Sequence, residues 1–347
     1  MTKIKIAING FGRIGRAAFK AALHHPDLQV VAINDLTDTK TLAHLLKYDS
    51  CYGQYDQTVD YTSDCLVVDN KKYLVLAQKE PEKLPWKKLG VQIVIESTGR
   101  FTDKEQAKLH LFAGAKKVII SAPASAKASA GKPGIDEVKT FVLGVNEQDL
   151  KKTDNIISMA SCTTNCLAPL TEVIRQKFGI AKAIMSTAHA YTADQNLVDG
   201  PHKDLRRARA AALSIVPTTT GAAIAVTETI PELKNKFDGM AMRVPVPVGS
   251  LCDVTFVLKK KTTVKAINQA LVAAAKTIKL KGILSTTDEE LVSADIVGNP
   301  SSSIVDLGLT KVVAGDLVKV VSWYDNEWGY ANRLADFCVY FGKQKML

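Results

Sequence analysis

The chain lacks the features that would place it outside the ordinary globular proteins. Among its 347 residues no run approaches about 18 consecutive apolar positions, and the first residues form neither a long apolar stretch nor a small-residue cleavage site. We therefore expect no membrane segment and no targeting signal. There are no internal repeats, and with 46% hydrophobic residues the chain is long enough for two domains with separate cores.

A disulfide framework and a zinc site are also not expected. The six cysteines are irregularly spaced, and no further Cys or His near the Cys162 and Cys166 pair completes a zinc pattern. This cysteine usage fits a reducing compartment, so we expect a cytoplasmic protein without a bound metal.

Charge of one sign is in modest excess. The formal net charge of +10 is compatible with nucleic acid or with phosphorylated small molecules. The lysines, however, are spread in short groups without interleaved aromatic residues, as at Lys71-Lys72 and Lys259-Lys260-Lys261. We interpret most of them as solvated faces, and nucleic acid is not expected as the main partner.

A phosphate-binding turn is predicted near the start of the chain. The strand-like run 4–9 leads into Gly10-Phe11-Gly12-Arg13-Ile14-Gly15, and the segment 16–24 is typical of a helix. A second strand, 28–33, precedes Asp35, which lies 20 residues after Gly15. This order is typical of a dinucleotide-binding unit, in which glycines let the backbone approach the pyrophosphate and the acid binds the ribose. Because Asp35 would repel a 2′-phosphate, the sequence favours NAD over NADP.

Two further strands are predicted in the first half of the chain, at 91–95 and 117–120, and polar residues follow both. Ligands of open α/β sheets bind beyond such carboxyl ends, so Thr98 and Ser121 are candidates for the cofactor site. A plain turn explains each of these sequences about as well. The stretch 124–134 is small, polar and interrupted by Pro and Gly, which predicts a surface loop.

The central motif is Ser161-Cys162-Thr163-Thr164-Asn165-Cys166, between an apolar strand and a predicted helix. If Ser161 caps that helix, Cys162 lies in its first turn, where unpaired backbone N–H groups and the helix dipole favour a thiolate. Cys166, one turn later, is interpreted as a packing residue. A buried small apolar role is the alternative for Cys162 as well.

Candidates for a partner of Cys162 and for phosphate binding occur later in the chain. His189 follows a strand and has polar neighbours, although a structural histidine is a serious alternative. Arg206 and Arg207 precede the run Pro217 to Gly221, where hydroxyl groups and a helix N-terminus suit phosphate. Arg243 lies in an apolar strand, and its partner is either an internal carboxylate or a substrate phosphate.

In their order along the chain, these motifs resemble the glyceraldehyde-3-phosphate dehydrogenase family, in its phosphorylating glycolytic form. The resemblance rests on the Gly10 to Gly15 turn, Ser161 to Cys166, His189-Ala190-Tyr191-Thr192, Pro217 to Gly221, Arg243-Val244-Pro245 and Trp323-Tyr324-Asp325-Asn326-Glu327. It covers nearly the whole chain. The segment 124–134 departs from it, being longer than the usual connection.

The resemblance implies an α/β protein. A Rossmann NAD-binding domain would comprise residues 1–161 and 326–347, and an α+β catalytic domain with a mostly antiparallel sheet would comprise residues 162–325. It further implies a homotetramer in which the stretch from Thr192 to about Pro217 packs at a subunit interface.

The implied reaction converts glyceraldehyde 3-phosphate and inorganic phosphate to 1,3-bisphosphoglycerate, with NAD reduction, through a hemithioacetal and a thioester. The resemblance assigns Cys162 and His189 to catalysis, Thr192, Arg207 and Arg243 to the substrate phosphate, and Ser161, Thr163, Thr220 and Gly221 to the attacking phosphate. The cofactor residues would be Gly10, Phe11, Gly12, Arg13, Ile14, Gly15, Asp35, Thr98, Ser121 and Asn326. Whether Arg206 or Arg207 faces the substrate stays open.

Three alternatives compete with this prediction. An erythrose-4-phosphate dehydrogenase would share Cys162 and His189 but release the acyl group to water, and the Thr218-Thr219-Thr220-Gly221 segment disfavours it. A basic nucleic-acid-binding protein could use the dinucleotide cleft. An NADP-dependent variant is the third.

Overall fold

The computed structural model describes residues 3–124 and 138–343, and within them the chain separates into two compact units. Unit 1 comprises Met1–Phe141, Gln148–Ala160 and Ala331–Leu347, and unit 2 comprises Val142–Glu147 and Ser161–Tyr330. Most of the predicted surface loop 124–134 lies outside the described residues. No helix among the described residues is both long and apolar enough to cross a membrane.

Unit 1 contains a mixed sheet whose central strands are parallel. In spatial order the described strands are β10 (Lys139–Thr140), β11 (Ile156–Ser158), β9 (Lys117–Ile120), β8 (Ile93–Glu96), β1 (Ile4–Asn9), β2 (Leu28–Asn34), β7 (Lys71–Leu76), β6 (Cys65–Val68) and β5 (Val59–Tyr61). The pairs from β10 to β7 are parallel, and β6 and β5 continue the sheet as an antiparallel edge.

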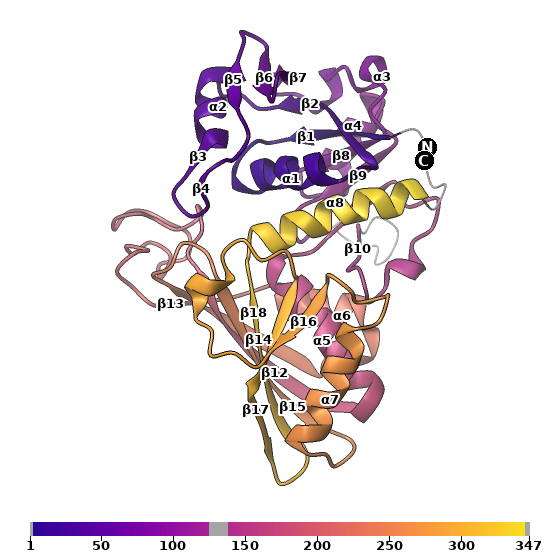
Figure 1. The fold of residues 1–347 in the computed structure, drawn as a ribbon, viewed down its shortest axis with the longest axis vertical. Helices are drawn as coiled ribbons and strands as arrows, with labels where there is room; N and C mark the ends of the chain where they lie inside the picture. The colour runs from indigo at the N-terminus through magenta and orange to yellow at the C-terminus, as the bar shows by residue number, and fades with distance from the viewer. Residues whose placement is uncertain (1–2, 125–137, 344–347) are drawn as a thin grey trace. The chain divides into compact units, whose positions relative to one another are not determined.

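The helices and short elements of unit 1 connect these strands (Figure 1). They are α1 (Arg13–His24), α2 (Thr39–Lys47), η1 (Pro81–Lys83), α3 (Trp86–Leu89) and α4 (Lys104–Phe112), with β3 (Tyr48–Asp49) and β4 (Gly53–Gln54) forming a small ladder. The last helix, α8 (Trp328–Lys343), returns to this unit from Ala331 onward. A run of fully buried apolar residues makes β1, β8 and β9 the centre of the core, which is typical of a parallel sheet covered on both faces.

Unit 2 contains a second sheet in which most neighbouring strands are antiparallel. Its order is β13 (Val216–Thr218), β14 (Phe237–Val244), β12 (Ile180–Ala190), β15 (Ser250–Leu258), β18 (Leu317–Tyr324), β17 (Ser303–Val313) and β16 (Leu284–Thr287). The pairs β12 with β14 and β16 with β17 are parallel. The described helices are α5 (Cys162–Phe178), α6 (Ala222–Thr229) and α7 (Val264–Ala275), with the short turns η2 (Glu147–Asp149), η3 (Pro231–Leu233) and η4 (Ser293–Ile296) also present in the chain.

Helix α5 is the buried centre of unit 2. It packs against α6 and α7 and against four strands of the sheet, β12, β15, β17 and β18. Most of its residues are buried, and Pro169 lies inside it without ending it. The N-terminus of α5 is thereby held against the middle of the sheet, next to the carboxyl end of β12.

Candidate active site and cofactor site

The glycine-rich turn of unit 1 is set by close backbone contacts. Gly10 follows β1 with a φ of +92°, and a Cβ atom there would lie 2.7 Å from the backbone nitrogen of Thr98. A Cβ atom on Gly15 would lie 2.0 Å from the carbonyl oxygen of Gly10. Both positions therefore require glycine, whereas the space around the Cβ position of Gly12 is open.

The predicted helix begins earlier than the sequence indicates, at Arg13 instead of Arg16. Gly12 is its N-cap residue and provides no side-chain cap, and a helix N-terminus beside a glycine-rich turn suits an anion. Arg13 is paired with Asp49 at 3.1 Å and lies over the ring of Tyr52. Ile14 is half-buried at the same helix start.

Asp35 lies directly after β2, beside the glycine-rich turn. One carboxylate oxygen accepts a hydrogen bond from the backbone N–H of Phe11 at 2.7 Å, and the other accepts from the N–H of Thr37 at 2.9 Å. These bonds fix the carboxylate against the turn. Thr98 and Ser121 follow β8 and β9, so the structure brings these two residues to the same sheet edge as Gly10 and Asp35.

The predicted nucleophile and its histidine are adjacent in unit 2. Cys162 is the first residue of α5, and Ser161 caps the helix by accepting a hydrogen bond from the N–H of Thr164 at 3.1 Å. His189 lies near the carboxyl end of β12. Its Nε2 atom is 3.4 Å from the Sγ atom of Cys162 (hydrogen-bond distance for sulfur).

The contacts of His189 indicate which ring nitrogen carries the hydrogen. Nδ1 is 2.7 Å from the carbonyl oxygen of Ala190, a distance that requires an N–H donor. Arg243 also approaches Nδ1, but its Nη1 hydrogens have acceptors in the Ala190 carbonyl at 3.1 Å and Thr192 Oγ1 at 2.9 Å. We therefore assign the neutral tautomer with Nδ1–H, which leaves Nε2 as an acceptor for the Cys162 thiol proton.

The pKa values of the pair differ from the sequence expectation of a resting thiolate. Some of the Cys162 side chain reaches solvent, but its surroundings withdraw the sulfur from water, and this burial raises the pKa of the thiol to about 11. The Arg243 cation and Thr163 oppose the shift without cancelling it. Burial, followed by Arg243, lowers the pKa of His189 to about 4. Burial thus opposes a charge on either member of the pair, and the 3.4 Å contact between Sγ and Nε2 couples their titration.

A cationic cluster lies on the other side of His189. Arg243 donates to Thr192, and the Thr192 hydroxyl donates to the carboxylate of Asp194. Arg207 pairs with the same carboxylate and donates to Thr218 at 3.0 Å. Arg206 is exposed, so Arg207 is the one of the two that the structure brings to Thr192.

Thr163, next to the nucleophile in the chain, belongs to a group of paired hydroxyls. The Thr163 hydroxyl is buried and paired with the Tyr324 hydroxyl at 2.9 Å, and Tyr324 is also 3.0 Å from the Thr187 hydroxyl. The Tyr324 ring meets the His189 imidazole edge-on, with centroids 6.0 Å apart. The sequence assigned no role to Asp194, and it gave Tyr324 only a place in the motif Trp323 to Glu327. Asp194 had the weak signal of lying two residues after Thr192, whereas the position of Tyr324 depends on strand pairing.

The remaining predicted residues of unit 2 lie on other elements. Thr220 and Gly221 form the N-terminus of α6, where Thr220 Oγ1 accepts from the N–H of Ala222 at 3.1 Å. Asn326 is buried, and its Oδ1 atom accepts from the Ser250 hydroxyl at 2.9 Å and from the N–H of Gly249. This orientation leaves the Nδ2 hydrogens of Asn326 as the group able to donate to a ligand.

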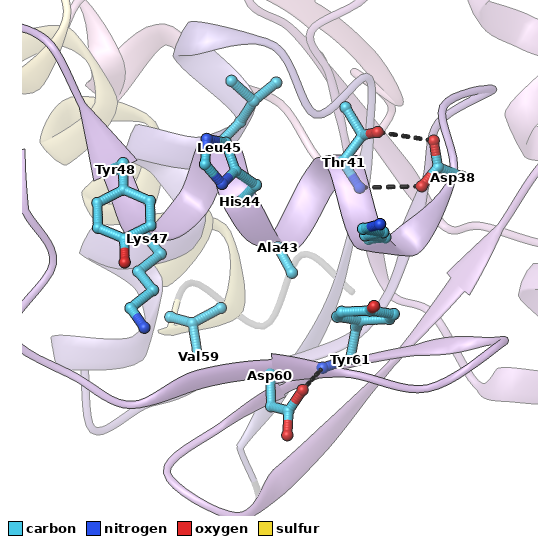
Figure 2. A pocket seen from close by; sticks show the side chains of 11 residues that line it. Asp38, Thr41, Ala43, His44, Leu45, Lys47, Tyr48, Val59, Asp60 and Tyr61 are labelled. Carbon is cyan, nitrogen blue, oxygen red and sulfur yellow. Dashed lines mark hydrogen bonds between the residues drawn. The ribbon is translucent and has the colours of Figure 1, made fainter.

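A surface pocket in unit 1 is separate from these residues. It has a volume of about 620 Å³ and is formed between α2 and β5 (Figure 2). Figure 2 shows His44 and Lys47 of the helix on one side, with Val59 and Tyr61 of the strand on the other. None of the predicted cofactor residues lines it. Within the described residues no group of three or more His, Cys, Asp or Glu side chains could hold a metal ion.

Comparisons with known proteins identify the family of the chain. Residues 161–326 match the family described as glyceraldehyde 3-phosphate dehydrogenase, C-terminal domain, and residues 4–104 match its NAD binding domain. The chain is 54% identical over 342 residues to glyceraldehyde-3-phosphate dehydrogenase of Geobacillus stearothermophilus, with 98% of this chain and 99% of the relative covered. With the same coverage, identity is 56% to the protein of that name from Mycolicibacterium smegmatis and 51% to that from Streptomyces coelicolor. The chain belongs to the glyceraldehyde-3-phosphate dehydrogenase family.

Proposed function

We propose that the protein oxidises glyceraldehyde 3-phosphate to 1,3-bisphosphoglycerate, using NAD and inorganic phosphate. The observation that carries this function is the Cys162 thiol 3.4 Å from an unprotonated His189 Nε2, at the N-terminus of α5 and beside Arg243. Membership of the family supports both the dehydrogenase activity and NAD as the cofactor.

The residues of unit 1 fit NAD. The close approach between Gly10, Gly15 and Thr98 is formed by backbone atoms and the Ser97 hydroxyl, and the N-terminus of α1 suits a pyrophosphate. The Asp35 carboxylate retains lone pairs for ribose hydroxyl groups beyond those used by Phe11 and Thr37. From unit 2 we propose one further cofactor residue, Asn326, which would donate from Nδ2 to the nicotinamide carboxamide. NAD, when bound, accepts the hydride released from the substrate carbon.

The first chemical step uses the neutral pair. His189 Nε2 accepts the thiol proton while Cys162 Sγ attacks the aldehyde carbon, so the nucleophile is generated only as the bond forms. The imidazolium then donates to the developing oxyanion, which gives a hemithioacetal. His189 next accepts the hydroxyl proton as the hydride leaves, and a thioester to Cys162 remains.

The second step transfers the acyl group to phosphate. An oxygen of inorganic phosphate attacks the thioester carbon and the C–S bond breaks with its electron pair on sulfur. The His189 imidazolium then returns the proton that it accepted from the hydroxyl group to the Cys162 thiolate, which restores the starting pair. We propose that the N-terminus of α5, through Ser161 and Thr163, and that of α6, through Thr220 and Gly221, bind this phosphate. The Thr163 hydroxyl already pairs with the Tyr324 hydroxyl. To bind the phosphate, Thr163 would have to break this hydrogen bond or share its hydroxyl between Tyr324 and the phosphate.

The phosphate of the substrate is assigned to Thr192, Arg207 and Arg243. The buried Nε atom of Arg243 has no hydrogen-bond acceptor among the described residues, which leaves guanidinium capacity for an oxyanion. Asp194 now neutralises Arg207, so an arriving phosphate would compete with that carboxylate for the same cation.

We further propose a cytoplasmic homotetramer in which residues 1–161 and 326–347 form the NAD-binding domain and 162–325 the catalytic domain. The two compact units support this division, although their edges differ from it. Interface formation by the stretch from Thr192 to Pro217 is supported by its apolar side chains, since Leu197, Leu205 and Leu213 are each at least 80% exposed.

The test is the initial rate of NADH formation from glyceraldehyde 3-phosphate and NAD, with and without inorganic phosphate. We expect sustained turnover that requires phosphate, and a loss of at least about 10⁴-fold in Cys162→Ser. Turnover indifferent to phosphate would instead support a hydrolytic enzyme of the erythrose-4-phosphate type. Folded protein inactive with both NAD and NADP would contradict the dehydrogenase function.

A further inference from the structure

Three polar side chains form a row across the carboxyl ends of adjacent strands in unit 1. Asn9 ends β1, and the strand registers place it opposite Asn34 of β2 on one side and Glu96 of β8 on the other. Asn34 Nδ2 donates to Asn9 Oδ1 at 2.7 Å, and Asn9 Nδ2 donates to Glu96 Oε2 at 2.6 Å. All three residues are buried, with Glu96 only 1% exposed.

The row continues behind β8 into α4 and α3. The indole Nε1–H of Trp86 donates to His110 Nδ1 at 3.1 Å, so that nitrogen carries no hydrogen and the imidazole is neutral. His110 Nε2–H therefore donates to Glu96 Oε2 at 3.0 Å. Trp86 and His110 are both fully buried. The direction of every hydrogen bond from Trp86 to Glu96 is thus determined.

Glu96 is the common acceptor of this network. Oε2 accepts hydrogen bonds from Asn9 Nδ2 and His110 Nε2. Oε1 accepts from the backbone N–H of Thr98 at 2.8 Å and from the Thr98 hydroxyl. Among the described residues, the carboxylate has four donors and no lysine or arginine partner. Removing one donor would leave acceptor capacity unsatisfied in a buried site, which is costly.

The network holds three loops that carry predicted cofactor residues. The glycine-rich turn follows Asn9, Asp35 follows Asn34, and Thr98 follows Glu96 by two residues. The spacing between these loops has little tolerance, because a Cβ atom on Gly10 would lie within 2.9 Å of Thr98 Cα. We call these three loops the cofactor cradle. Because the Glu96 carboxylate accepts hydrogen bonds from both Thr98 and Asn9, it sets the distance between the loops.

We propose that Glu96 is a positioning residue for NAD, which fixes the glycine-rich turn, the Asp35 loop and Thr98 relative to one another through the Trp86, His110, Asn9 and Asn34 network. The inference rests on the proposed NAD site. It also assigns a chemical character to Thr98. Both of its hydrogen-bond donors are committed to Glu96, and its hydroxyl already accepts from the backbone N–H of Arg100 at 3.1 Å, so only the remaining lone pair of that oxygen can accept from the cofactor or from solvent.

The primary test is Glu96→Gln, which keeps the shape of the side chain but turns an NH₂ group toward existing donors. We expect the Kd for NAD to rise at least about 10-fold, corresponding to about 1.4 kcal/mol, while kcat at saturating NAD stays within 3-fold. The alkylation rate of Cys162 by iodoacetamide without NAD should be unchanged. The matched control is Asp154→Asn, since this carboxylate of unit 1 is 11% exposed and pairs with Lys139 outside the network.

A second pair of variants separates positioning from folding. His110→Leu deletes the donor to Glu96, and we expect NAD binding to weaken about 3- to 10-fold, whereas His110→Gln retains an N–H donor and should restore most of the affinity. An unchanged Kd in both Glu96→Gln and His110→Leu would overturn the inference, as would an equal loss in Asp154→Asn. If Glu96→Gln fails to fold, the His110→Leu and His110→Gln variants decide between the outcomes alone. Failure of the wild-type protein to bind NAD would instead contradict the proposed function.

Discussion

The cofactor cradle of unit 1 and the catalytic pair of unit 2 both depend on burial, but burial acts on them in different ways. In the cradle the buried polar side chains of the Glu96 network are satisfied: Glu96 has four donors, and Asn9 and Asn34 are paired. In unit 2 burial shifts the pKa of Cys162 upward and that of His189 downward, and the Arg243 Nε atom has no acceptor within the part of the chain that the structure describes. The first site is thereby fixed in shape, and the second keeps unused capacity for a substrate.

The sharpest way to separate the two sites is to remove the base of unit 2. In His189→Asn the thiol loses the acceptor for its proton, while the residues of the cradle are untouched. We expect kcat to fall about 10²- to 10⁴-fold and the Kd for NAD to stay within 2-fold. Single-turnover NADH formation and cofactor titration measure the two quantities. A large loss of NAD affinity would show that the two sites are not independent.

The cradle can be broken in turn through its backbone contacts. Gly15→Ala places a methyl group 2.0 Å from the Gly10 carbonyl oxygen, so we expect a loss of about 1–3 kcal/mol in the free energy of unfolding and weaker NAD binding. Gly12→Ala is the matched control, because nothing lies within 4 Å of its Cβ position, and its stability should change by less than about 0.5 kcal/mol. Urea unfolding compares them, and equal stabilities would contradict the close approach.

The effect of burial on His189 predicts a specific pH dependence. Burial and the Arg243 cation both disfavour the imidazolium, so the base is lost only as the pH falls through about 4, and kcat/KM should be flat from there through neutrality. In Arg243→Gln the pKa of His189 should rise, which moves the acidic limb of kcat/KM to higher pH, independently of the lower absolute rate. The pH profiles of both proteins test this. A wild-type limb near pH 6.5 would contradict the assigned effect of burial.

Much of this contrast could be predicted from the sequence, because it depends on local signals. Ser161 was identified as the cap of α5, and the glycine-rich turn was found between β1 and α1, since capping and tight turns depend on residues a few positions apart. The upward shift of the Cys162 pKa was not predicted from the sequence. It is caused mainly by burial, which Arg243 and Thr163 oppose, and burial in the fold cannot be inferred from the residues next to Cys162 in the chain.

The choice between Arg206 and Arg207, and the whole Glu96 network, could not be predicted for a related reason. Adjacent arginines differ only in the direction that the loop gives them. Glu96 lies 14 residues before His110 and 87 residues after Asn9. The register of β1 against β8 brings Asn9 to Glu96, whereas His110 reaches it from helix α4. The spacing of residues along the chain does not determine how β1 aligns with β8. The sequence shows only that each of the two strands is apolar.

The smallest expected effect concerns Cys166, which tests whether the reactivity of unit 2 belongs to one cysteine. Cys166 is fully buried, and its thiol contacts the Ser303 hydroxyl at 3.9 Å, so it is shielded from any substrate that reaches Cys162. Cys166→Ala removes one sulfur from a packed core, and we expect a cost of roughly 1–2 kcal/mol in the free energy of unfolding with kcat within 2-fold of wild type. The rates of NADH formation and urea unfolding give both values. A loss of kcat without a loss of stability would mean that Cys166 influences the nucleophile one helical turn away, and packing alone would not account for it.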